Sequence, residues 1–239
     1  MKRLLAGLIL GSIIMVNVQA QEIYATFNVE AQKSANLAFS ASGIVDKVMV
    51  DVGDEVKKQQ ILVKLQNDDL KALLAVTKTK LKYAKRDYRR RLKIKNIIDA
   101  AALDKFASIS DITTAQLKYQ QAQLDKTTLK APFDGVITQK LVEDGDVVSG
   151  AMIRTILQIQ SLHERKLVLE YDQKYWDDVK AGDTFRYKLD GSDKVYEGRI
   201  TKIYPAIDTQ RRKIKAEVKA KDLKVGLFGD GTIITDTKK

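Results

Sequence analysis

The apolar and polar positions follow the same short pattern twice along this chain. Residues 42–56 alternate β-branched and polar residues around a Gly-Asp turn signal, and residues 134–148 repeat that arrangement. The matched positions keep one constant offset: Gly43 with Gly135, Gly53 with Gly145, Asp54 with Asp146, Val56 with Val148, Ile61 with Ile153 and Leu65 with Leu157. Because neither copy can bury its apolar face alone, we expect the pair to form one small β-sandwich with turns at Gly43, Gly53, Gly135 and Gly145.

The stretch between the two copies has the apolar spacing of long helices. It holds neither Gly nor Pro between Val56 and Ala131, and it is rich in Ala, Leu, Lys and Gln. Apolar and small residues recur at steps of four and three along two arms: Leu70, Leu74, Thr77, Leu81, Ala84, Tyr88 and Leu92, then Leu103, Phe106, Ser110, Thr113, Leu117, Gln120 and Leu124. This heptad-like spacing favours two helices packed nearly antiparallel as a coiled-coil hairpin.

The turn of this hairpin is predicted at Asn96 to Asp99. Asn96 can take the left-handed conformation that ends a helix, and Asp99 can cap the next helix by accepting from the amide of Ala101 or Ala102. This placement gives arms of about 28 residues, or roughly 40 Å each at 1.5 Å per residue.

An ordinary globular helical bundle could bury the same stripe, but the polar and charged residues beside the stripe on the first arm leave little room for a second buried face on that helix. The residues that restrict it are Tyr83, Lys85, Arg86, Arg89, Arg90, Lys93 and Lys95. A projecting hairpin that needs a partner is therefore the better interpretation.

The residues from Arg165 onward change to a period of two. Five alternating segments are separated by turn signals at residues 181–183, 190–192 and 229–231, which is typical of a small closed β-barrel. The segment from Tyr24 to Phe39 also alternates and is predicted to add a strand to this barrel.

The first twenty residues have the three-part form of a secretory signal. A basic start at Lys2 and Arg3 precedes an apolar run from Leu4 to Val16, and small residues predict cleavage before Gln21. The apolar run is shorter than the ~20 residues that span a bilayer, so a cleaved signal is favoured over an anchor.

Composition adds two constraints. The chain has no Cys, so it can form no disulfide and carry no amino-terminal lipidated Cys. Its formal charge of +11 falls by two when Lys2 and Arg3 leave with the signal. Because an exported chain rarely meets nucleic acid, we interpret the charge as solvation of the hairpin and a preference for acidic protein or anionic lipid surfaces.

Together these patterns resemble the periplasmic adaptors, or membrane fusion proteins, of tripartite efflux pumps. The split sandwich halves, the hairpin and a barrel signature occur in the family's order over nearly the whole mature chain. The second half opens with residues 131–137 (APFDGVI), and the barrel signature comprises residues 179–182, 196–198, 203–208 and 223–228. The resemblance implies an α+β, elongated fold with a lipoyl-like β-sandwich made of two split halves, an inserted α-helical coiled-coil hairpin and a small antiparallel β-barrel.

The resemblance also implies a function. Such adaptors form rings, here expected as homo-hexamers, that join an inner-membrane transporter to an outer-membrane channel and export drugs or toxic compounds. The hairpin length favours the proton-driven type of transporter by analogy. The protein is accordingly expected in the periplasm, held at the inner membrane through its transporter.

Family adaptors contact the channel through a motif at the hairpin tip, with a basic residue, a Leu four positions on and a Ser seven after that. Leu92 matches the Leu, Asn96 stands at the usual Gly turn, and Asp99 replaces the Ser while keeping its capping chemistry. The basic position falls on Tyr88, with Arg89 one residue away. The implied contact residues are Arg89, Leu92, Asn96 and Asp99, and helix termination alone is the simpler alternative for Leu92 and Asp99.

The expected domains are a signal at 1–20, a strand joining the barrel at 21–38, sandwich halves at 39–66 and 131–164, the hairpin at 67–130 and the barrel at 165–239. Family members usually continue into a membrane-proximal domain. Here the chain stops shortly after Ile234, which implies that this domain is absent or a remnant and that the barrel is the main transporter-facing surface.

Other classes of function lack the residues that they need. His163 is the single imidazole and is expected as a linker residue, so no His metal site or Ser-His-Asp triad is supported. Met49 and Met152 are expected to fill the core of their strands. No cofactor, metal, catalytic residue or nucleic-acid partner is predicted. A stand-alone periplasmic scaffold whose hairpin docks an envelope partner remains the alternative.

Overall fold

The computed structural model describes residues 20–236 and places them in two compact units. Residues up to Glu30 join those from His163 onward in one unit, while Ala31–Leu162 form the other. The predicted signal at residues 1–20 lies outside the described part of the chain except for Ala20. No helix within residues 20–236 combines the length and apolarity needed to cross a membrane.

The first unit is a closed antiparallel β-barrel of order β1-β10-β13-β12-β11-β14. Its strands are β1 (Ala20–Ala31), β10 (Glu164–Asp172), β11 (Thr184–Leu189), β12 (Val195–Asp208), β13 (Lys213–Lys221) and β14 (Phe228–Asp236), and a short 3-10 helix, η1, spans Gln173–Tyr175. Alternate residues of β1 point inward and are buried, as period-two strands require. Phe27, Phe185 and Tyr187 pack ring against ring in the core, with centroids 5.1 to 5.8 Å apart.

One charged group on the barrel wall is held by specific partners. The Tyr204 hydroxyl donates to Glu217 Oε1 at 2.5 Å, and Lys166 Nζ lies 3.5 Å from the same oxygen. Burial alone would raise the pKa of Glu217, but the Tyr204 hydrogen bond and the Lys166 charge together bring it below its ordinary value of 4.5. A lowered carboxyl pKa stabilises the fold above the unfolded-state pKa, and this contribution is lost as pH falls below about 4.5.

We expect Glu217→Gln to destabilise the barrel by about 1–3 kcal/mol at pH 7, because it weakens a charge-assisted hydrogen bond. The difference from the unsubstituted protein should shrink as pH is lowered from 5 to 3, measured by thermal unfolding. Glu197→Gln, at an exposed ion pair with Arg186, is the matched control and should change little. Equal losses at pH 7 and pH 3 would contradict this account.

The second unit contains a two-sheet sandwich. One sheet has the order β2-β9-β7-β4 and the other β6-β5-β3-β8. The strands are β2 (Ser34–Leu37), β3 (Gly43–Val48), β4 (Glu55–Val56), β5 (Ile61–Leu65), β6 (Thr128–Lys130), β7 (Gly135–Lys140), β8 (Val147–Val148) and β9 (Leu157–Ser161). The predicted barrel strand at 21–38 is therefore divided, because β1 ends at Ala31 while β2 pairs with β9 of the sandwich.

The two repeat copies build each sheet jointly by exchanging their short strands. β3 of the first copy pairs with β8 of the second, and β4 pairs with β7. The turns are exchanged too: the Gly53 amide donates to the Ile137 carbonyl at 2.8 Å, and the Gly145 amide donates to the Val45 carbonyl at 2.9 Å. Each copy therefore completes the hydrogen bonding of the other, which explains why neither is a separate domain.

The offset between the two copies changes before their last strands, so two of the predicted pairs, Ile61 with Ile153 and Leu65 with Leu157, are wrong. Val45 faces Leu65 in the first copy, whereas Ile137 faces Ile159 in the second. Leu65 thus corresponds to Ile159 and not to Leu157, because the second copy contains two additional residues between β8 and the residues of β9 that pair with β7. Ile153 lies between β8 and β9 and is 78% exposed, so it does not match Ile61.

The four predicted turn glycines separate into two kinds. Gly53 and Gly145 have φ of 95° and 92°, the left-handed region that favours glycine. Gly43 and Gly135 instead begin strands β3 and β7, so their prediction as turns is wrong. At Gly135 the requirement is close approach, since an added Cβ would lie 2.3 Å from the Gln160 carbonyl oxygen.

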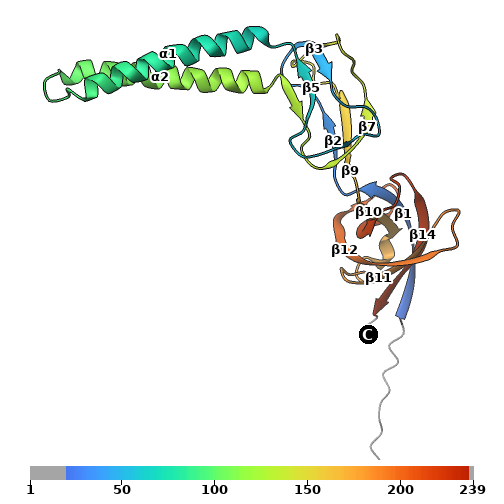
Figure 1. The fold of residues 1–239 in the computed structure, drawn as a ribbon. Helices are drawn as coiled ribbons and strands as arrows, with labels where there is room; N and C mark the ends of the chain where they lie inside the picture. Colours follow the sequence, from blue (N-terminus) through green and yellow to red (C-terminus); the bar gives the residue numbers. More distant parts are fainter. Residues whose placement is uncertain (1–19, 237–239) are drawn as a thin grey trace, which may run out of the picture. The chain divides into compact units, whose positions relative to one another are not determined.

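Between β5 and β6 the chain forms the helical hairpin of α1 (Asp68–Leu92) and α2 (Ala100–Asp125), which lie side by side in Figure 1. The buried positions belong to the two predicted stripes: Leu74, Thr77, Leu81, Ser110 and Gln120. At the base, Asn67 Nδ2 donates to Thr127 Oγ1 at 2.9 Å. None of the described side chains of the sandwich core comes from α1 or α2, so the hairpin packs chiefly on itself.

The polar stripe of α2 leaves one buried atom without a partner. Gln120 is 7% exposed, and its Oε1 accepts no hydrogen bond from any described residue. Since an unsatisfied buried polar atom costs about 1–3 kcal/mol, we expect Gln120→Leu to stabilise the hairpin by about that amount, measured by thermal unfolding. Gln121→Leu, at the neighbouring exposed position, is the control and should have little effect. A lower melting temperature for Gln120→Leu would count against this account.

Candidate docking site at the hairpin tip

The tip is built by a short turn between two well-defined helix ends. α1 ends at Leu92. Beyond it, the Ile94 amide donates a hydrogen bond to the Arg91 carbonyl and the Ile97 amide donates one to the Ile94 carbonyl, each 3.0 Å long. Asp99 is the N-cap of α2, where its carboxylate accepts from the Ala102 amide at 3.2 Å. The carboxylate thus satisfies an amide that the helix leaves free.

Asn96 does not adopt the predicted left-handed conformation. Within residues 20–236, the non-glycine residues with positive φ are Gln59, Arg212 and Asp222. The reversal starts earlier, at Lys93, and hydrogen bonds between residues three or four apart in the chain carry it across without a left-handed residue. The helices are consequently 25 and 26 residues long, shorter than the predicted arms.

The four candidate contact residues differ in solvent exposure and in the contacts that they already make within the hairpin. Leu92 ends α1 and is 44% exposed, whereas the other stripe positions are buried or half-buried. Arg89 Nε donates to the Lys85 carbonyl at 3.2 Å, so part of its guanidinium lies along its own helix. Asp99 is engaged in capping, and Asn96 is exposed in the turn. Leu92, Asn96 and Asp99 share the tip, and Arg89 lies about one turn before it.

Sequence reasoning missed the most exposed apolar side chains of the tip. Ile97 is 87% exposed and Ile94 is 45% exposed, both in the turn. Across the hairpin, the Arg91 guanidinium lies over the Phe106 ring, 4.7 Å from its centroid, and joins the two arms. A signal was available, since branched aliphatic residues inside a turn have no core to enter.

Other candidate residues do not gather into a site. His163 Nδ1 lies 3.3 Å from Asp222 Oδ1, and both side chains are exposed. No group of three His, Cys, Asp or Glu within residues 20–236 is arranged to hold a metal ion. Met152 is 77% exposed and Met49 is exposed as well, so the prediction that they fill the core is wrong. Met152 belongs to the longer link before β9, which carries it outside the sheet.

One known family matches the segment that contains the sandwich and the hairpin. A family described as the CzcB-like, barrel-sandwich hybrid domain matches residues 33–158. Over 204 residues the chain is 25% identical to the cobalt-zinc-cadmium resistance protein CzcB of Cupriavidus metallidurans, covering 78% of this chain and 39% of that protein. It is also 25% identical over 226 residues to the macrolide export protein MacA of Escherichia coli O157:H7, covering 77% and 58%. The chain therefore spans about half the length of these curated relatives.

Solved structures show the same fold. A chimera of MacA carrying the α-hairpin domain of Pseudomonas aeruginosa MexA superposes with a TM-score of 0.82 at 20% identity, covering 90% of this chain and 81% of the chimera. MacA from Actinobacillus actinomycetemcomitans superposes with a TM-score of 0.62 at 20% identity, covering 92% and 81%. The split sandwich, its hairpin and the barrel are thus a shared architecture.

Proposed function

Because the chain belongs to the CzcB-like barrel-sandwich hybrid family, we propose that it is a periplasmic adaptor linking an inner-membrane efflux transporter to an outer-membrane channel. The observation that carries this proposal is the hairpin itself. Two helices of 25 and 26 residues extend from a sandwich whose core they do not enter, and they end in exposed apolar residues. Such an element adds little to the sandwich core, and its form suits reaching another molecule.

The mechanism of such an adaptor is structural. The sandwich and hairpin would form the wall of a tube, and the barrel would face the transporter. We propose a homo-hexameric ring, a proton-driven transporter and a contact with the outer-membrane channel through Arg89, Leu92, Asn96 and Asp99. The exported compounds would be drugs or toxic substances. The named relatives act in resistance to cobalt, zinc and cadmium and in macrolide export, so both classes belong in a test panel.

Deleting the hairpin tests the proposal. Replacing Lys71–Lys126 by a short Gly-Ser linker keeps Asn67 and Thr127, whose hydrogen bond closes the base. Since α1 and α2 contribute no described residue to the sandwich core, we expect the shortened protein to fold and be exported. The host's tolerance of a panel of antibiotics, detergents and divalent metals should then fall to that of a strain lacking the gene.

Two controls make the result interpretable. Periplasmic levels of the shortened protein establish that loss of tolerance does not come from loss of the protein. Chemical crosslinking of the full chain in cells should capture an outer-membrane channel and ring-sized species. Unchanged tolerance of every compound with intact export would overturn the adaptor proposal in favour of a stand-alone scaffold.

A further inference from the structure

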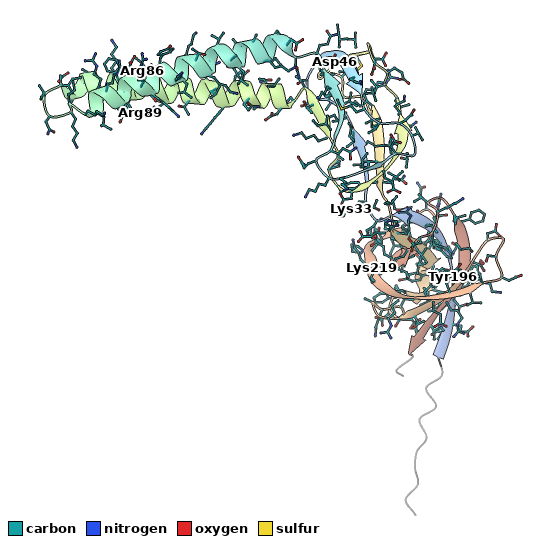
Figure 2. All side chains as sticks on the ribbon, in the orientation of Figure 1. Lys33, Asp46, Arg86, Arg89, Tyr196 and Lys219 are labelled. Atoms are coloured by element: carbon teal, nitrogen blue, oxygen red, sulfur yellow. The ribbon has the colours of Figure 1, made fainter. Side chains whose placement is uncertain are left out.

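The outer half of the hairpin carries a strongly one-sided charge. Between Lys78 and Lys95 every charged side chain except Asp87 is a Lys or an Arg. The facing helix mixes both signs with Asp104, Lys105, Asp111 and Lys118. Figure 2 labels Arg86 and Arg89 in this outer half. The positive charge of the hairpin is therefore concentrated on α1 and in the turn.

This charge is not compensated within the hairpin. Among the described residues of this segment, the one ion pair is Arg86 with Asp87 at 3.7 Å, and both side chains are about half exposed. No ion pair joins α1 to α2 in the described part of the chain. Like charges at neighbouring helical positions destabilise a helix by a few tenths of a kcal/mol per pair. The segment thus keeps charges that work against its own stability, as expected of a surface that meets an anionic partner.

The geometry of the charges indicates the shape of that partner. Arg89, Arg90 and Arg91 are consecutive, and successive residues of an α-helix point about 100° apart, so the three are spread over about 200° of the helix circumference. Lys93 and Lys95 follow in the turn. We call residues 89–91, 93 and 95 the basic collar. A groove on a protein contacts one side of a helix, whereas a flat anionic surface met end-on contacts all sides at once.

The apex beyond the collar is apolar. Ile97 is 87% exposed and Ile94 is 45% exposed, and both are in the turn that follows the three arginines. Exposed aliphatic side chains framed by Lys and Arg have the chemistry of segments that enter the boundary between lipid headgroups and acyl chains.

We propose that the hairpin tip docks end-on onto an anionic phospholipid membrane, with Ile94 and Ile97 entering the headgroup boundary and the basic collar on the phosphates. This proposal goes beyond the adaptor function and does not rest on it, since it needs no transporter, channel or ring. Within an adaptor, such docking would confine the search for a channel to the plane of the membrane.

The experiment uses the chain from Ala20 to Lys239, which contains every described strand and helix but lacks the apolar leader. Binding to vesicles of phosphatidylcholine alone, or with about one third phosphatidylglycerol, is measured by co-sedimentation at 50 and 300 mM NaCl. We expect binding to the anionic vesicles only, and weaker binding at high salt, because salt screens the attraction.

Two triple variants with the same charge change distinguish end-on docking from general attraction. A cation close to an anionic surface contributes about fivefold to binding, so changing Arg90, Lys93 and Lys95 to Gln should weaken binding roughly 100-fold. This choice leaves the contact between Arg91 and Phe106 in place. The matched control changes Lys78, Lys80 and Lys82 to Gln. A rise of 1.5 Å per residue puts Lys80 about 15 Å behind Arg90, which is about one Debye length at 50 mM NaCl and more than two at 300 mM, so a much smaller loss of binding is expected.

A further variant tests the apolar apex. Ile97→Ser keeps every charge but removes the side chain expected to enter the bilayer, and it should weaken binding about tenfold. Circular dichroism of all variants checks that the helices persist. Equal losses in the two triple variants, or equal binding to neutral and anionic vesicles, would overturn the proposal. Binding to soluble polyglutamate without binding to anionic vesicles would overturn it in favour of an acidic protein partner.

Discussion

Gly135→Ala is expected to destabilise the sandwich by about 3 kcal/mol, because the added methyl group would meet backbone. A Cβ at this position lies 2.3 Å from the Gln160 carbonyl oxygen and 3.0 Å from an Ile159 side-chain carbon. The backbone of Gln160 cannot move freely, since β7 and β9 are paired along this stretch. Overpacking against a fixed neighbour is among the more damaging single substitutions. Urea unfolding of the purified protein measures the loss.

The internal repeat supplies the matched control for this prediction. Gly43 is the equivalent of Gly135 in the first copy, but a Cβ there lies 3.4 Å from Leu65 Cδ1, an ordinary contact with a side chain that can adjust. We expect the free energy of unfolding of Gly43→Ala to be within about 1 kcal/mol of that of the unsubstituted protein. If both variants are equally stable, the close approach at Gln160 does not explain the glycine.

Leu92→Asp is expected to abolish export while leaving the fold nearly unchanged. Leu92 ends α1 at 44% exposure, so replacing it removes little buried apolar surface from the hairpin. The new carboxylate would stand where the adaptor proposal places the channel, and desolvating an unpaired charge in an interface costs several kcal/mol. Tolerance of the exported compounds should fall to the level of a strain without the gene, with normal periplasmic levels and helix content.

Leu73→Asp is the control for this variant. Leu73 is also on α1 and about half exposed, but it lies near the base of the hairpin. A contact confined to the tip predicts normal tolerance for Leu73→Asp. Normal tolerance for Leu92→Asp, or equal defects in both variants, would contradict a channel contact at the tip.

The fold class could be predicted because its strands and helices produce periodic patterns of apolar residues within short segments of the sequence. Alternation with period two predicted the sandwich and barrel strands, and steps of four and three predicted the stripe on which Leu74, Leu81 and Ser110 are buried. These patterns reflect which side of a strand or helix faces apolar neighbours, and that information is carried by each segment itself.

What the sequence did not reveal depends on contacts between distant segments. The need for glycine at Gly135 comes from the Gln160 backbone, and the two-residue shift that matches Leu65 to Ile159 comes from strand pairing. A constant offset was the simplest extrapolation from the well-matched turns. At the tip, Asn96 satisfied a local rule for ending helices, but turns closed by hydrogen bonds between residues three or four apart made that conformation unnecessary.

The exchanged strands have a consequence for the order of folding. Gly43 in β3 cannot pair until Val148 in β8 is available, so the sandwich depends on contacts between residues far apart in the chain, which form slowly. The hairpin shortens that search, because helix pairing can begin near the tip and proceed through local contacts until Asn67 and Thr127 meet at the base. The same helices that extend outward in the finished protein therefore bring the two halves of the sandwich together during its assembly, and a chain with a weakened hairpin should refold more slowly even where its final stability is preserved.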